Sequence, residues 1–277
     1  AQFKALPSGF RELSPEEVEE GKQNPSESGL LPRQEPGVRV SCALAYQLYA
    51  GGGVSPDGRS FALALEARNE VFGGKSAGSA FHVYTPGTYR GSREVRTRAY
   101  AMEPGHRVED SWEIDGFENG VYHLRVCGPN GFFREFTGGA DDPPVAIECE
   151  YEAGNAPERL SGNVELRVAN LDASRDYTFQ LTDHGYGGGQ QAKTLRAGEK
   201  ASVILNLRRS WNWYDFSVRV EGFSRFERRF AGRVETGKAG YSDPAMGRAG
   251  SREARRQSLP LPAREEPEDS PARSGRR

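Results

Sequence analysis

The stretch NGVYHLRVCGPNGFFREFTG, Asn119–Gly138, decides the fold, because the chain repeats it as NWYDFSVRVEGFSRFERRFAG, Asn212–Gly232. Each copy opens with apolar residues at every second position, turns at a glycine-containing loop and returns with a second alternating run. Alternation on both sides of a tight turn predicts an antiparallel hairpin with one buried face. The chain therefore carries two copies of one β-structure.

The returning half of each copy carries the motif Phe-x-Arg-x-Phe-x-Gly. Each motif residue recurs 94 positions later in the chain: Phe132, Arg134, Phe136 and Gly138 recur as Phe226, Arg228, Phe230 and Gly232. Each arginine shares strand parity with its two flanking phenylalanines, so all three side chains lie on one face. We expect both arginines to stack on aromatic rings, at a sheet edge or between the two repeats.

A repeat of this length is too long for a solenoid unit and predicts two tandem domains of one kind. Six or seven short strands per unit, separated by glycine turns, predict an all-β fold of two antiparallel β-sandwiches resembling the immunoglobulin or fibronectin class. The expected boundaries are a polar linker over 1–36, sandwiches over 37–140 and 143–237, and a disordered tail over 248–277. The tail has eight basic and five acidic residues and little to bury.

Apolar alternation and turn residues locate the remaining strands. In the first unit they are expected at Val38–Tyr49, Phe61–Arg68, Ala80–Thr85, Glu94–Ala101 and Arg107–Ile114, with loops at Gly51–Gly53 and Ser55–Gly58. In the second unit they are expected at Val145–Tyr151, Val164–Asn170, Tyr177–Thr182, Lys193–Gly198 and Ala201–Leu207. Near the N-terminus, Ser14 followed by Pro15 predicts the start of one helical turn over Glu16–Glu20.

Composition excludes some functions. The formal net charge of −2 over 277 residues gives no indication of nucleic-acid binding. No apolar signal segment and no run long enough to span a bilayer is present. The first residue is Ala1, and we expect the sequence to be cut from something longer. The cysteines Cys42, Cys127 and Cys149 lie on predicted strands without metal-ligand spacing; buried thiols are the simple interpretation, and one disulfide is the alternative.

No catalytic residue, metal site or cofactor site is predicted. The four histidines lack the spacing of a metal pair. The glycine-rich run Gly185–Gly189 leads back into a strand, whereas a phosphate-binding loop opens a helix, so a hairpin loop is expected. Asp57, Asp141 and Asp142 lack the ligand spacing of a calcium loop. No serine lies in a recognisable nucleophile context.

Aromatic residues near the predicted hairpin ends suggest a contact with lipid. Aromatic side chains at loop tips favour the headgroup region of a bilayer, while in a sandwich core they simply fill space. The candidates for the lipid surface are Phe132, Phe133, Trp211, Trp213 and Phe223. Both interpretations remain open at this point.

Several motifs resemble the C-terminal region of bacterial phosphocholine-preferring phospholipases C, a family with hemolytic and non-hemolytic members. The resemblance covers about residues 30–247. The motifs are Leu31–Arg39, Gly128–Phe136, Trp213–Phe216, Phe226–Gly237 and Ser242–Gly247. One departure is Ala45, where members of the family usually have proline, and the tail after Gly247 looks additional.

The resemblance implies the C-terminal part of a secreted enzyme that cleaves phosphatidylcholine or sphingomyelin and releases phosphocholine. In that family the catalytic residues belong to an upstream domain, which would be the main partner of this part; a membrane lipid surface is the second partner considered. Residues 1–36 would then include the end of the upstream region. An independent carbohydrate-binding or adhesion module is the alternative, since the sandwich fold permits it equally. The oligomeric state is not predicted.

Overall fold

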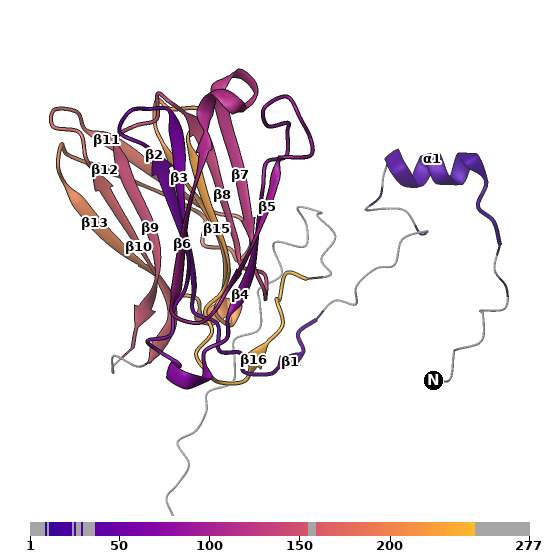
Figure 1. Ribbon diagram of the computed structural model, residues 1–277. Helices are drawn as coiled ribbons and strands as arrows, with labels where there is room; N and C mark the ends of the chain where they lie inside the picture. Colours follow the sequence, from indigo (N-terminus) through magenta and orange to yellow (C-terminus); the bar gives the residue numbers. More distant parts are fainter. Residues whose placement is uncertain are drawn as a thin grey trace, which may run out of the picture. The chain divides into compact units, whose positions relative to one another are not determined.

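The computed structural model describes residues 9, 11–23, 25, 29, 37–154 and 159–246 (Figure 1). Within them the chain consists of antiparallel strands, one α-helix and short 3-10 helices, so the predicted all-β class is confirmed. Residues 38–244 belong to one compact part and the helix to another, and each is described by itself. The predicted tail 248–277 and most of the predicted linker 1–36 lie outside the described residues.

The strands follow the order expected from the sequence. The first repeat contains β1 (Val40–Ser41), β2 (Leu48–Val54), β3 (Ser60–Ala67), β4 (Ser79–Tyr84), β5 (Thr97–Met102), β6 (His106–Glu113), β7 (Val121–Cys127) and β8 (Phe133–Gly139). The second contains β9 (Val145–Ala153), β10 (Leu160–Asn170), β11 (Tyr177–Asp183), β12 (Gln190–Leu195), β13 (Lys200–Leu205), β14 (Trp213–Val220), β15 (Glu227–Arg233) and β16 (Gly240–Tyr241). The 3-10 helices are η1 (Gly73–Lys75), η2 (Ile114–Gly116), η3 (Glu118–Gly120) and η4 (Arg208–Ser210).

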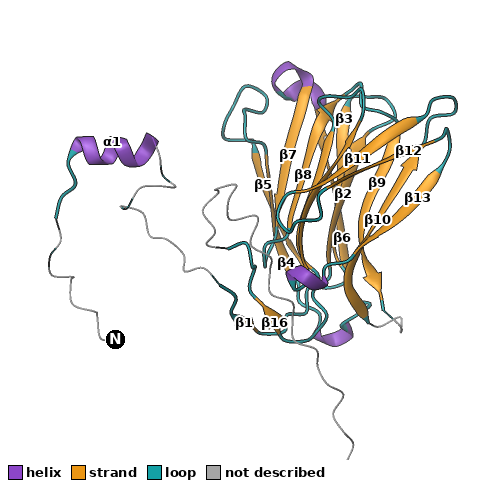
Figure 2. Cartoon of the chain, turned by 180° about the vertical axis from the view of Figure 1, so that it is seen from behind, coloured by secondary structure: helices purple, strands orange, loops and turns teal. Residues whose placement is uncertain are grey.

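One wide sheet crosses both repeats. Its eight strands lie in the order β12-β11-β14-β15-β8-β7-β4-β5, so the hairpin β7–β8 joins the hairpin β14–β15 edge to edge. Figure 2 labels β7 and β8 of the first repeat and β11 and β12 of the second, which belong to this sheet. Two three-stranded sheets, β2-β3-β6 and β13-β10-β9, each belong to one repeat. The repeats are therefore two sandwiches that share a continuous layer.

The pairing of β8 with β15 gives the shared layer a local twofold axis. In this antiparallel pair Phe136 lies opposite Arg228, and Arg134 lies opposite Phe230. Glu135 and Arg229, which are equivalent positions of the two motifs, lie opposite each other at the centre. The same motif thus supplies both sides of the contact, as in a twofold-symmetric dimer.

Each repeat has its own hydrophobic core, and strand alternation explains why. In β3 the side chains of Phe61, Leu63 and Leu65 are 0–1% exposed, while the residues between them face outward. Aromatic residues dominate the interior of both cores, including Trp112 in the first repeat and Phe216 in the second. Alternation at period two is what lets such short strands bury one face against the opposite layer.

The glycine run near the start of the first repeat does not form the predicted loop. Gly51–Gly53 lies inside β2 and pairs with Ala62–Ala64 of β3. Gly52 is required there because a Cβ atom at this position would lie 2.5 Å from a ring carbon of Phe61. The predicted strand over Val38–Tyr49 is only partly confirmed, because within it β1 covers only Val40–Ser41 and β2 begins at Leu48.

Helix α1 (Pro15–Gln23) begins where the sequence predicts and is longer than the predicted single turn. The amide of Glu17 donates to Ser14 Oγ over 3.3 Å, and the amide of Ser14 donates to Glu17 Oε2 over 2.9 Å. This reciprocal capping box satisfies two amides that the helix itself leaves without acceptors. Among the described residues, no helix is long and apolar enough to cross a membrane.

Candidate functional site

Arg134 is a fully buried arginine at the junction of the repeats. Its side chain is 0% exposed, and its guanidinium carbon lies 4.2 Å from the ring centre of Phe132. Nη1 donates to the carbonyls of Phe133 and Ala231, at 2.8 and 2.9 Å, and Nη2 donates to the Tyr214 hydroxyl at 3.0 Å. An arginine of the first repeat is thus bound by the second.

Arg228 makes the reciprocal contacts from the second repeat into the first. Its guanidinium carbon lies 4.2 Å from the ring centre of Phe226, and the residue is 5% exposed. Nη1 donates to the Thr137 carbonyl at 2.9 Å, and Nη2 donates to the Tyr122 hydroxyl at 2.7 Å. The expectation that both motif arginines pack on aromatic rings is confirmed.

The glycine of each motif makes room for the tyrosine that receives the other repeat's arginine. Gly138 lies opposite Tyr122 and Gly232 lies opposite Tyr214 in their hairpins. A Cβ atom on Gly138 would lie 2.5 Å from the Tyr122 hydroxyl, and one on Gly232 would lie 3.2 Å from the Tyr214 hydroxyl. The arginine and glycine of the motif Phe-x-Arg-x-Phe-x-Gly therefore act together in the contact between the two repeats.

The two junctions differ in charge. Arg228 Nη2 lies 3.3 Å from Asp142 Oδ2, and the Tyr122 hydroxyl also donates to this carboxylate. Among the described residues Arg134 has no carboxylate partner, and its Nε makes no hydrogen bond. Burial raises the pKa of both acceptor tyrosines, Tyr122 and Tyr214, so each hydroxyl keeps its proton.

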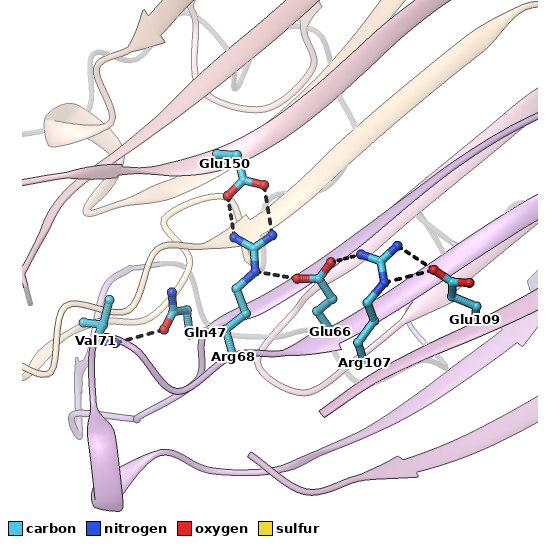
Figure 3. Close-up of polar contacts among 7 residues, drawn as sticks. All are labelled: Gln47, Glu66, Arg68, Val71, Arg107, Glu109 and Glu150. Carbon is cyan, nitrogen blue, oxygen red and sulfur yellow. Dashed lines mark hydrogen bonds and ion pairs between the residues drawn. The ribbon is translucent and has the colours of Figure 1, made fainter. Parts of the chain in front are cut away.

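A chain of ion pairs links the outer strands of the two repeats. Arg68 donates through Nη1 and Nη2 to the carboxylate of Glu150 in β9, at 2.8 and 3.3 Å (Figure 3). Its Nε donates to Glu66 in β3, and Glu66 is shared with Arg107 of β6 (Figure 3). Beside these ion pairs, the amide of Val71 donates to the Gln47 side chain over 3.2 Å.

These pairs are half-buried and alternate in sign. Burial acts to raise the pKa of Glu66, but hydrogen bonds and charge from Arg68 and Arg107 outweigh it and leave that pKa lowered. The pKa of the Arg68 guanidinium is raised because its bonds to Glu150 and Glu66 outweigh the opposing effect of burial. The arrangement keeps Glu66 and Arg68 charged, and the bond from Arg68 to Glu150 ties the end of β3 in one repeat to β9 of the other.

A groove opens between the two three-stranded sheets. It is bounded by the edge strands β2 and β9, encloses about 1270 Å³ and reaches down to Phe226 and Arg228 on the shared layer. At one end the strands meet through Tyr49 and Tyr151, whose ring centres are 4.9 Å apart.

Two of the five aromatic residues predicted to contact lipid are in the interior. Phe132 is 4% exposed and Trp213 is 8% exposed, so neither presents its ring to solvent. Phe132 packs on Phe81 and Arg134, and Trp213 Nε1 donates to the Tyr241 carbonyl over 3.0 Å. For these two residues the core interpretation is the right one.

The other three candidates are partly exposed and lie at opposite ends of the shared layer. Phe133 begins β8 and lies opposite Ala231 near the end of β15, on the side of Trp211. Phe223 is in the β14–β15 turn and packs edge-on against Tyr177 at 5.6 Å. Because β8 and β15 are antiparallel, their hairpin turns point in opposite directions, and one flat membrane surface cannot contact both.

The polar residues considered for chemistry serve local structure. Within the described ranges no three histidine, cysteine, aspartate or glutamate side chains gather as metal ligands. The run Gly185–Gly189 forms the predicted hairpin loop, with the Asp183 carboxylate accepting the amides of Gly185, Tyr186 and Gly188. All three cysteines are unpaired; Cys42 is exposed and Cys149 is buried, which raises its pKa to about 11.

The sequence did not identify Tyr122, Tyr214 and Asp142 as partners of the motif arginines. A signal was present for the tyrosines, because Tyr122 and Tyr214 are each the first of the alternating apolar positions in their copy of the repeated stretch. The sequence placed Asp142 between the two predicted sandwiches and among three aspartates that lack the spacing of a calcium loop. The pairing of Asp142 with Arg228 depends on how the second repeat packs on the first, and the periodicity of a strand gives no information about that packing.

The chain matches the family model described as bacterial phospholipase C, C-terminal domain, twice, over residues 40–139 and 145–233. It is 35% identical over 239 residues to the non-hemolytic phospholipase C of Pseudomonas aeruginosa, covering 82% of this chain and 31% of that protein. It is 31% identical over 221 residues to the non-hemolytic phospholipase C of Burkholderia pseudomallei, covering 79% and 29%.

A third relative is the hemolytic phospholipase C of Pseudomonas aeruginosa. The identity is 30% over 228 residues, covering 78% of this chain and 30% of that protein. The chain thus spans about a third of the length of the curated relatives that it matches.

Proposed function

Since the chain belongs to the family of bacterial phospholipase C C-terminal domains, we propose that it is the non-catalytic C-terminal part of a secreted phospholipase C. The parent enzyme would hydrolyse phosphatidylcholine or sphingomyelin and release phosphocholine. In this proposal the chain supports an upstream catalytic region, and that region is its principal partner. The phosphodiester chemistry belongs to residues outside this sequence.

One observation carries the non-catalytic part of the proposal. The arginines that both copies of the motif share pack between the two repeats. Arg134 and Arg228 are 0% and 5% exposed, and their hydrogen bonds go to acceptors inside the chain. A substrate could not reach the fully buried Arg134 guanidinium without separating the shared layer, and the Arg228 guanidinium is already bound by Thr137, Tyr122 and Asp142. The bonds that both motif arginines make to the other repeat support a structural role for the motif.

The test compares three proteins on vesicles of phosphatidylcholine and of sphingomyelin: this chain, the longer enzyme that contains it, and the same enzyme lacking it. We expect no phosphocholine release by the chain alone and clear release by the longer enzyme. For the truncated enzyme we expect a lower rate of phosphocholine release or a lower thermal stability. Turnover by the purified chain would refute the non-catalytic role. A truncated enzyme that matches the longer one in stability and rate would refute the supporting role.

Contact with a lipid surface is a separate part of the proposal and rests on the partly exposed aromatics. Trp211 and Phe223 mark the two ends of the shared layer, so Trp211→Ala and Phe223→Ala serve as controls for each other. If one end docks on lipid, one substitution reduces co-sedimentation with vesicles and the other does not. No binding by the unsubstituted chain, or equal binding by both variants, would argue against it; binding on a glycan array instead would favour the adhesion alternative.

A further inference from the structure

The groove between β2 and β9 is walled by two strand edges that no other strand of the described chain covers. β2 pairs only with β3, and β9 pairs only with β10. The two edges run alongside the same groove but are not hydrogen-bonded to each other as strands. Uncovered strand edges are sites where another extended segment can add.

The pairing register shows which backbone groups face the groove from β2. The amide of Ser55 donates to the Ser60 carbonyl, and that of Arg68 donates to the Gln47 carbonyl. In an antiparallel pair, bonded positions alternate, so the odd-numbered residues of β2 bond to β3. The amide and carbonyl groups of Ala50, Gly52 and Val54 therefore point away from β3 toward the groove.

The same reasoning applies to β9. The amide of Leu171 donates to the Pro144 carbonyl, which makes the even-numbered residues of β9 the ones bonded to β10. The backbone groups of Ile147 and Cys149 point toward the groove. Two rows of donors and acceptors thus face one space, and backbone groups in a partly enclosed place need partners.

The size and lining of the groove favour an extended chain over a compact ligand. Its volume of about 1270 Å³ exceeds the roughly 300–1,000 Å³ of sites for drug-sized molecules. Along β2 and β3 the lining includes the small residues Ala50, Gly51–Gly53, Ala62 and Ala64, and a Cβ atom added at Gly51 or Gly53 would touch nothing within 4 Å. An incoming backbone can therefore approach these edges closely.

The charge of the lining indicates the chemistry of the occupant. Three guanidiniums face the groove, from Arg68, Arg107 and Arg228. Six carboxylates face it: Glu66, Glu109, Asp110, Asp142, Glu148 and Glu150. Arg98 pairs with Asp110 from outside the lining, which reduces the excess of negative charge without cancelling it. The remaining excess favours a segment that carries lysine or arginine.

We propose that this groove binds an extended, basic polypeptide segment of a partner protein, which pairs as an added strand with β2, β9 or both. Backbone bonds to Gly52 and Ile147 would supply affinity, and the carboxylates at the rim would select basic side chains. This inference is independent of the phospholipase assignment, because it uses only the geometry of the groove.

The probe is a labelled ten-residue peptide that alternates lysine with valine, followed by fluorescence anisotropy on the whole chain. Two control peptides replace lysine by glutamate, or replace every valine by proline, which removes amide donors. We expect saturable binding of the basic peptide and at least tenfold weaker binding of both controls. Backbone amides of Ala50, Gly52 and Ile147 should become protected from hydrogen exchange on binding.

The chain offers a matched pair of variants. Ile147→Pro removes a donor that points into the groove, and Ile204→Pro removes one that points away from the same sheet at its other edge, on β13. We expect Ile147→Pro to weaken binding of the basic peptide at least tenfold and Ile204→Pro to change that binding by no more than twofold. The two variants should have similar melting temperatures.

Equal effects of the two proline substitutions, or no saturable binding of any peptide, would overturn the proposal. So would self-association of the chain that Ile147→Pro abolishes, because a second copy would then be the occupant. If Ile147→Pro fails to fold, Gly51→Trp replaces it, since its side chain extends into open space and narrows the groove. Unchanged binding in that variant would also overturn the proposal.

Discussion

The guanidinium of Arg228 donates to the hydroxyl of Tyr122 over 2.7 Å, although 106 positions separate the two residues in sequence. The same guanidinium lies 3.3 Å from the Asp142 carboxylate, so a charge of the second repeat is neutralised inside the first. The stability of each sandwich therefore depends on the presence of the other.

Replacing Arg228 by methionine should destabilise the chain by about 3–5 kcal/mol, because it leaves the Asp142 carboxylate buried without its cation. The measurement is equilibrium unfolding in urea. Adding Asp142→Asn to Arg228→Met should recover a substantial part of the loss, because the uncompensated charge is gone. A double variant no more stable than Arg228→Met would show that the charge is not the cause.

Replacing Arg134 by methionine should cost clearly less, about 1–2 kcal/mol. No carboxylate among the described residues is left unpaired, and the loss is chiefly that of the bond to the Tyr214 hydroxyl and the contact with the Phe132 ring. Tyr214→Phe should be non-additive with Arg134→Met in a double-mutant cycle. Equal costs for the two arginines would contradict the difference in charge between the junctions.

Gly138→Ala should destabilise the chain by more than about 2 kcal/mol, because the added methyl group displaces both the Tyr122 hydroxyl and the Asp142 carboxylate. Gly51→Ala is the matched control, since its Cβ atom meets nothing within 4 Å. That substitution should change the unfolding free energy by no more than about 1 kcal/mol. Similar effects at both glycines would rule out the steric explanation.

The Glu135 carboxylate should make stability depend on pH in the acid range. Hydrogen bonds from His123 and Arg125 lower its pKa to about 2 against the opposing effect of burial, whereas in the unfolded chain it is about 4.3. A lowered folded-state pKa contributes stability above pH 4.5 that is lost as pH falls toward 2. Glu135→Gln should flatten this part of the pH profile of the unfolding free energy; an unchanged slope would contradict the assignment.

Both repeats should unfold in one transition, because the shared layer and the exchanged arginines cross their junction. Trp112 is buried in the first core, and Trp213 lies in the second repeat. A variant that keeps only Trp112 reports on the first repeat, and a variant that keeps only Trp213 reports on the second; in each, the other two tryptophans are replaced by phenylalanine. Urea midpoints from the two probes should coincide. Separate midpoints in the otherwise native chain would show two independent domains.

The repeated alternation of Asn119–Gly138 and Asn212–Gly232 was enough to predict the hairpins, and the motif parity was enough to place Arg134 and Arg228 on aromatic rings. Periodicity describes each strand's own faces, so it could not show that β8 pairs with β15 or that Asp142 meets Arg228. It also misassigned Gly51–Gly53, because glycine favours turns locally and only the packing of the Phe61 ring makes it necessary in a strand.

Aromatic content was a weak guide to a membrane surface for a related reason. A hairpin end that is exposed in an isolated sandwich is covered when a second sandwich adds to the same sheet. Phe132 illustrates this, since its ring lies under the guanidinium that bonds to Ala231 and Tyr214 of the other repeat. Which turn is covered depends on the arrangement of the repeats and not on the sequence of the turn.

The pair of Glu135 and Arg229 lies where the local twofold axis passes through the sheet, and each residue therefore faces its own counterpart. Two identical copies of the first repeat would place glutamate against glutamate at this point, and two copies of the second would place arginine against arginine. Like charges directly opposite across strands are destabilising. A chain with two identical halves would be penalised at this position, so the difference between the copies here favours the pairing of one repeat with the other over the pairing of either repeat with a copy of itself.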